Sequence, residues 1–172
     1  MRLLAPNARG TLHWLLWPAL LITAATPMWA ALGDTSAAVV ADQARWHGTL
    51  ASTDKGAFTV HEITVPSGAK IREYVSPAGA VFGVAWDGQF APNFQDLLGP
   101  YYQQLQQAIA EQKAANETST QTGGQPVRRR RGPVMIETPG LVFAQSGHLR
   151  SFHGQAYIPQ LVPQGVQTSD IR

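Results

Sequence analysis

His61 and Glu73 are the two side chains whose types and spacing come closest to those of an acid–base pair. They lie in consecutive runs of alternating polarity, residues 57–65 and 69–75, separated by the turn Pro66-Ser67-Gly68. If the runs pair across this turn, His61 lies opposite Glu73 on antiparallel strands. A carboxylate beside a half-buried imidazole orients the ring and raises its proton affinity, as a catalytic base requires. The same pair would equally satisfy two polar groups at a sheet margin, so both interpretations stay open.

No nucleophile or metal-ligand pattern accompanies this pair. Ser76 lies in Val-Ser-Pro-Ala-Gly, which lacks the first glycine of a nucleophile elbow. His61-Glu62 lacks the second histidine of a zinc-protease helix, and on a strand these neighbours point to opposite faces. His148 and His153, five residues apart, also fall on opposite faces. No phosphate-binding or dinucleotide-binding glycine motif is present, so we predict neither a metal site nor a cofactor.

Two sets of residues are candidates for binding. Arg72 and Tyr74 share a predicted sheet face with Lys70, and Arg72 lies opposite Glu62, although ordinary solvated sheet surface would look the same. The second set is a run of four guanidiniums, which suit phosphate or carboxylate groups on an envelope polymer, an anionic lipid or a partner protein. A solvated loop tip is the alternative for this run, which comprises Arg128, Arg129, Arg130 and Arg131. No aromatic residues interleave with it, which disfavours nucleic acid as the partner.

The first 30 residues have the pattern of an export signal. Arg2 and Arg9 are the only charged residues before Asp34, and an apolar stretch at residues 14–25 follows them. Small residues follow in turn, so we expect a signal peptide cleaved near Ala30 and a periplasmic or secreted bacterial protein. A retained membrane anchor is the alternative, because residues 14–33 are about long enough to span a bilayer.

Composition limits the remaining chain to one ordinary domain. The 172-residue sequence has no cysteine, so it contains neither a disulfide nor a thiolate metal site, which is typical of a bacterial periplasmic protein. It contains 13 Lys and Arg against 11 Asp and Glu. Both excess cations lie in the predicted signal, so the mature chain is balanced and a globally basic nucleic-acid binder is not expected.

The elements that would position these candidates are those of an α+β fold. A helix is predicted at residues 34–46, and a third alternating run, 80–86, extends the meander. Pairing Val75 with Ala80 would place Phe82 beside Glu73, on an apolar core face. The opposite, wetter face would carry Glu62, Thr64, Lys70, Arg72 and Tyr74.

The second half of the sequence alternates helical and extended segments. A short helix follows Asn93, and a central helix begins at Pro100 and ends near Ala115. A mobile linker or loop is predicted at about residues 113–133, followed by strands at 134–136, 140–144 and 149–158. We therefore predict a single domain over residues 31–172. It has an antiparallel meander sheet of about five strands, packed by the N-terminal and central helices.

Several segments give the sequence a family resemblance. They are Ala31-Leu32-Gly33, Thr59-Val60-His61-Glu62-Ile63, Arg72-Glu73-Tyr74-Val75-Ser76-Pro77-Ala78-Gly79, Val84-Ala85-Trp86-Asp87-Gly88 and Gly154-Gln155-Ala156-Tyr157-Ile158-Pro159. With these, the chain resembles a bacterial secreted family, domain of unknown function 2844. The resemblance covers nearly all of the predicted mature chain and implies export and a single domain. It implies no activity and no catalytic residues.

Three functions follow as hypotheses. The first is an exported, non-enzymatic accessory module that binds an envelope component or a partner protein. The second is a small periplasmic hydrolase-like enzyme with His61 as base and Glu73 as its orienting group. The third is attachment to anionic surfaces through Arg128–Arg131. In all three, the membrane is contacted only by an uncleaved signal segment or through anionic lipid headgroups.

Overall fold

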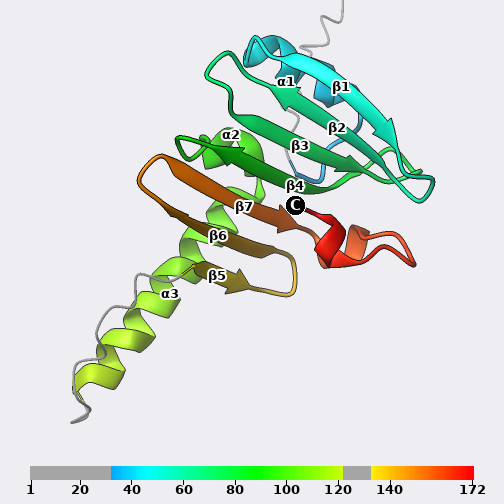
Figure 1. The fold of residues 1–172 in the computed structure, drawn as a ribbon. Coiled ribbons are helices and arrows are strands. Elements are labelled where there is room, and N and C mark those ends of the chain that lie inside the picture. Colours follow the sequence, from blue (N-terminus) through cyan, green and yellow to red (C-terminus); the bar gives the residue numbers. More distant parts are fainter. Residues whose placement is uncertain (1–31, 122–132) are drawn as a thin grey trace, which may run out of the picture.

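Seven antiparallel strands form one sheet in the computed structural model, which describes residues 32–121 and 133–172 (Figure 1). The strand order is β1-β2-β3-β4-β7-β6-β5, so the first four strands form a meander and the last three add to it in reverse. The strands are β1 (Thr49–Asp54), β2 (Thr59–Thr64), β3 (Lys70–Val75), β4 (Val81–Gly88), β5 (Val134–Glu137), β6 (Val142–His148) and β7 (Ser151–Tyr157).

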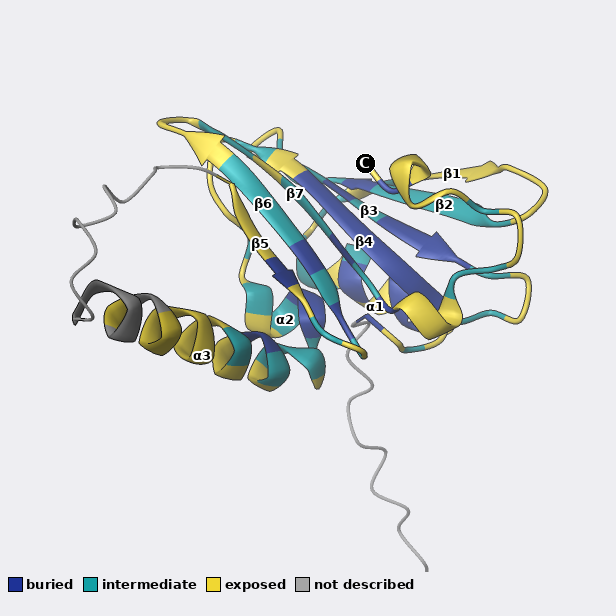
Figure 2. Cartoon of the chain, turned by 90° about the horizontal axis from the view of Figure 1, so that it is seen from below, coloured by how far each residue is buried: buried dark blue, intermediate teal, exposed yellow. Residues whose placement is uncertain are grey.

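The three helices lie on one side of this sheet (Figure 2). They are α1 (Ala37–Arg45), α2 (Phe94–Leu98) and α3 (Tyr101–Gln121). The other side is crossed by the tail, residues 159–172, which contains two short 3-10 turns, Pro159–Leu161 and Thr168–Asp170. We call the two sides of the sheet the helix face and the tail face.

The α+β class and the antiparallel sheet are confirmed, but the sheet has seven strands and not about five. The strand that the sequence concealed is β1. It reads Thr-Leu-Ala-Ser-Thr-Asp, is exposed except at Leu50, and forms one edge of the sheet. An edge strand with so little buried surface carries almost no apolar alternation, so periodicity cannot reveal it.

The register between β2 and β3 is the predicted one: His61 lies opposite Glu73, and Glu62 lies opposite Arg72. The predicted register between β3 and β4 is wrong. Glu73 lies opposite Val84, and the pairing shifts between Tyr74 and Val75. This β-bulge leaves an additional residue on β4, because two residues of one strand oppose one of the other.

The bulge moves Phe82 to the tail face. There its side chain is buried with Tyr74, Ala85 and Ile171, whereas the prediction had placed it on the core face beside Glu73. Tyr74 was expected on a wet face and is instead buried, because the tail covers it. A covering segment about 100 residues away in the sequence leaves no trace in local periodicity.

The main apolar core lies between the sheet and the helices. Trp86 is central to it, with its ring 5.2 Å from that of Phe94 and 5.5 Å from that of Phe143. The helices contribute the buried residues Val39, Leu97, Leu98 and Leu105. The core therefore fixes all three helices to the same face.

Sequence signals explain the helix boundaries in the middle of the chain. The Asn93 side chain caps α2 by accepting a hydrogen bond from the Gln95 amide at 3.1 Å. Gly99, with φ of 50°, ends α2 in a conformation that favours glycine. Helix α3 starts as predicted but continues to Gln121, so the first part of the expected linker at 113–133 is helical. Among the described residues, no helix is both long and apolar enough to cross a membrane.

Candidate functional site

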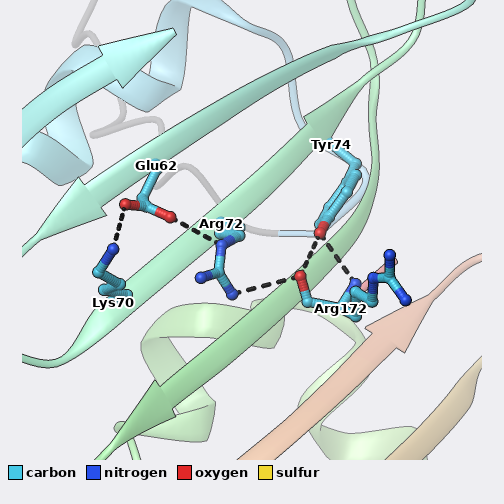
Figure 3. A network of polar contacts seen from close by, with 5 residues as sticks. All are labelled: Glu62, Lys70, Arg72, Tyr74 and Arg172. Carbon is cyan, nitrogen blue, oxygen red and sulfur yellow. Dashed lines mark hydrogen bonds and ion pairs between the residues drawn. The ribbon is translucent and has the colours of Figure 1, made fainter. Parts of the chain in front are cut away.

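A network of polar side chains lies on the tail face at β2 and β3 (Figure 3). Glu62 accepts hydrogen bonds from Lys70 Nζ and Arg72 Nε, both at 2.8 Å. Arg72 Nη1 donates to the main-chain oxygen of Arg172 at 3.2 Å, and the Tyr74 hydroxyl donates to the same oxygen at 2.7 Å. The Arg172 amide in turn donates to the Tyr74 hydroxyl at 2.9 Å. The two predicted binding residues, Arg72 and Tyr74, are thus brought together, and both hold the tail.

The surroundings of these groups shift their proton affinities in opposite directions. Hydrogen bonds from Lys70 and then Arg72 lower the pKa of Glu62, because they stabilise its ionised form. Burial raises the pKa of Tyr74, so its hydroxyl keeps its proton and can donate it to Arg172. The network at neutral pH therefore contains one carboxylate between two cations, beside a neutral phenol.

Two hollows flank the network on the tail face. One, of about 350 Å³, lies over β4, β7 and β6, and its walls include Asp87, Gln155 and Pro133. The other, of about 590 Å³, lies over β1, β2 and β3, and its walls include Lys55 and Phe58. Arg72 and Arg172 line both hollows. These two residues therefore stand where the hollows meet.

A serine–histidine pair lies in the smaller hollow. Ser146 Oγ is 2.6 Å from His153 Nε2, and Asp87 is the cross-strand neighbour of His153. A hydrolytic triad also needs a group that orients the imidazole. Within the described parts of the chain, no carboxylate makes a hydrogen bond or ion pair with His153. The pair supplies polar lining to the hollow, and the described residues around it assemble no triad.

His61 and Glu73 are cross-strand neighbours on the helix face, but their polar contacts go to different partners. His61 Nδ1 lies 2.7 Å from Ser52 Oγ on the edge strand. Burial lowers the pKa of His61, and Glu73 does not contribute to that shift. Glu73 is only 1% exposed and faces Asp42 of α1. The geometry therefore separates the proposed base from its proposed orienting group.

Asp42 and Glu73 form a buried carboxyl pair between α1 and the sheet. Burial, then the neighbouring charge of Asp42, raises the pKa of Glu73 to about 9. Burial also raises the pKa of Asp42 to about 6, although Arg45 Nη1, 2.7 Å from its Oδ1, opposes the shift. The raised pKa of Glu73 favours its neutral form at pH 7, next to the Arg45–Asp42 ion pair. A sealed group of this kind docks α1 and has no access to a substrate.

The remaining candidates are placed as follows. Arg128, Arg129, Arg130 and Arg131 lie outside the described residues, but the residue that follows Gly132 in the sequence, Pro133, lines the smaller hollow. No group of three or more His, Asp or Glu side chains in residues 32–121 and 133–172 is arranged to hold a metal ion.

Sequence reasoning missed Asp42, Ser146 and Arg172. The sequence contained one signal for Asp42. It lies three residues after the apolar Val39 in the predicted helix 34–46, so both side chains are on the same face of that helix. Ser146 and Arg172 had none, because their partners come from tertiary contacts.

An α+β protein with a helix-covered face and a hollowed, polar opposite face is thus defined by the structure. The chain belongs to the family described as protein of unknown function (DUF2844), whose model matches residues 28–171. The match confirms the resemblance drawn from the sequence motifs. No curated protein and no solved structure matches the chain.

Proposed function

We propose that the protein is an exported, non-enzymatic binding module, and that its ligand lies on the tail face at Arg72. The observation that carries this proposal is that Arg72 lines both hollows, so a ligand in either one meets its guanidinium. A binding face is favoured over hydrolase chemistry because Glu73 is sealed against α1, away from His61, and residues 32–121 and 133–172 place no triad in the hollows. The ligand is an envelope component or a partner protein.

Site-specific photo-crosslinking tests this proposal. A photo-reactive residue replaces Gln155, in the smaller hollow, and in a matched chain it replaces Gln106, on the exposed side of α3. Crosslinking in intact cells is expected to produce adducts from position 155 only, and Arg72→Gln is expected to reduce them. Equal adducts from both positions, or none from position 155, would count against the proposal. The same cells show whether the chain is exported and cleaved near Ala30, through the mass of the mature protein.

Attachment to anionic surfaces is a second candidate function. It is favoured by Pro133, because the four guanidiniums of Arg128–Arg131 precede it closely in the sequence and it borders a hollow lined by two more. Co-sedimentation with vesicles containing anionic phospholipid is expected at low salt and is expected to disappear at high salt. Replacing all four arginines with glutamine should have the same effect. Binding that survives both changes would exclude this function.

A further inference from the structure

The tail contacts the sheet in the way that a bound peptide contacts a receptor. Ile171 is completely buried in an apolar pocket formed with Tyr74, Phe82 and Ala85. The next residue, Arg172, is held by its main chain: Tyr74 contacts both its amide and its carbonyl oxygen, and Arg72 contacts the oxygen. One apolar anchor beside a clamped main chain is a common basis of peptide recognition.

The pocket for Ile171 depends on a glycine in β4. A Cβ atom on Gly83 would lie 3.2 Å from Ile171 Cδ1 and 3.4 Å from its Cγ2, which is tighter than ordinary packing. Gly83 lies beside the β-bulge, which also turns Phe82 toward this face. The backbone irregularity and the missing side chain together produce a recess of the size of one branched apolar side chain.

The tail is not part of the sheet ladder. No pairing joins it to any described strand, and the amides of Val166, Asp170 and Ile171 donate to carbonyls within the tail itself. Its contacts with the rest of the protein include the Ile171 anchor, the clamp on Arg172, the partly buried Val162 and Val166, and a hydrogen bond that the Gln160 side chain donates to the main-chain oxygen of Pro139. Because these contacts are few, they can open without unfolding the sheet.

Removing the last residues of the tail from this face would join the two hollows. Both are lined by Arg72 and Arg172, and Asp170 also lines the larger one. Together the two hollows lie over β1, β2, β3, β4, β7 and β6, and the tail residues Asp170 and Arg172 stand among their walls. Neighbouring strands lie about 4.8 Å apart, so hollows that together span six strands have room for an extended chain.

We propose that the tail occupies a peptide-binding groove in cis, and that the partner is an extended protein segment that places a branched apolar side chain in the Ile171 pocket. This inference rests on the proposed binding function of the tail face and specifies its partner. The structure itself supplies the occupant's chemistry, because the protein's own segment is seated there. A partner segment must displace the tail, so binding to the intact protein is weakened by competition within the chain.

The test uses a fluorescein-labelled peptide with the sequence of residues 162–172 and measures its fluorescence polarisation. Ile171→Ala in the full chain frees the pocket, and it is expected to bind the peptide at least tenfold more tightly than wild type. Val166→Ser is a second way of loosening the tail, should Ile171→Ala fail to fold by circular dichroism. Ile109→Ala on α3 is the matched control, and it should bind as weakly as wild type.

Two further changes define specificity. Gly83→Ala added to Ile171→Ala should weaken binding by narrowing the pocket, and a peptide carrying alanine in place of its isoleucine should bind more weakly still. Equal affinity for wild type and the loosened variants, or for the two peptides, would overturn the inference. Binding of a fluorescent fatty acid in place of the peptide would also overturn it and would indicate an acyl ligand. Adducts at position 155 without peptide binding would leave the binding function standing and remove only this inference.

Discussion

The two faces of the sheet are built from the same strands but differ in what covers them. On the helix face, β3 and β4 contribute Ile71, Val84 and Trp86 to a large core closed by α1, α2 and α3. On the tail face, the same strands contribute Arg72, Tyr74 and a small cluster, which the tail covers. Successive side chains of a strand point to opposite faces, so one pair of strands serves both purposes. The larger buried cluster lies on the helix face and the smaller one on the tail face.

The carboxyl groups of the two faces show the same contrast. Glu73 on the helix face is buried without a direct cation, and its pKa is raised. Glu62 on the tail face is bonded to Lys70 and Arg72, and its pKa is lowered. Burial is the main cause of the pKa shift where helices seal the sheet, and charge pairing is the main cause where solvent reaches it.

Trp86→Ala should have the largest effect, because it opens a cavity at the centre of the helix-face core. We expect a loss of about 3–5 kcal/mol in the free energy of unfolding, measured in urea. The matched control is Phe90→Ala, since Phe90 is 73% exposed and should change stability little. If Trp86→Ala lowered the free energy of unfolding no more than Phe90→Ala does, the helix-face core would not be the main source of stability.

Glu73→Gln should change how stability depends on pH. A carboxyl whose pKa is raised in the folded state binds its proton more tightly there than in the unfolded chain. Wild-type stability should therefore fall as pH rises from the ordinary pKa near 4.5 toward about 9. The steepest slope from one such group is about 1.4 kcal/mol per pH unit. Above about pH 6, where Asp42 no longer contributes, glutamine should remove this slope, and Glu111→Gln on exposed α3 should retain it. An unchanged slope in Glu73→Gln would argue against a buried neutral carboxyl.

Tyr74→Phe should loosen the tail at a smaller cost, on the order of 1–2 kcal/mol, because two hydrogen bonds to Arg172 are lost. Hydrogen exchange should accelerate in residues 159–172 and remain slow in β3 and β4. Tyr102→Phe on α3 is the control and should leave tail exchange unchanged. Acceleration across the whole sheet would mean that the tail is part of the main cooperative unit.

Glu62→Gln should have the smallest effect, about 0.2–1 kcal/mol, since its ion pairs are partly solvated. The contribution of Glu62 to stability changes with pH in the direction opposite to that of Glu73. A lowered folded pKa stabilises the protein above the unfolded pKa, and that contribution is lost as pH falls through the folded pKa. Comparing wild type and variant between pH 3 and 7 should show the difference shrinking in acid. A difference that grows in acid would contradict the lowered pKa.

Much of the central sheet could be predicted because local signals agreed there. The hairpin turn and the polarity of both runs set the same register, so the pairing of His61 with Glu73 was correct. The predicted register between β3 and β4 was wrong because of a β-bulge. One additional residue near Phe82 changes the register without altering the composition of the strand. For the candidate site, Arg72 and Tyr74 were predicted, whereas Arg172 was not. Its position depends on a contact between residues 98 apart in sequence.

By itself, the sequence determined the fold class, the family, the β2–β3 register and the caps of α2, since turn chemistry and polarity act over a few residues. Only the tertiary structure decided which carboxyl Glu73 meets, on which face Phe82 is buried, and that the tail covers Tyr74. These outcomes depend on which segments remain to cover each face once the sheet has formed. Burial and pairing between distant segments set them, and such interactions have no local period in the chain.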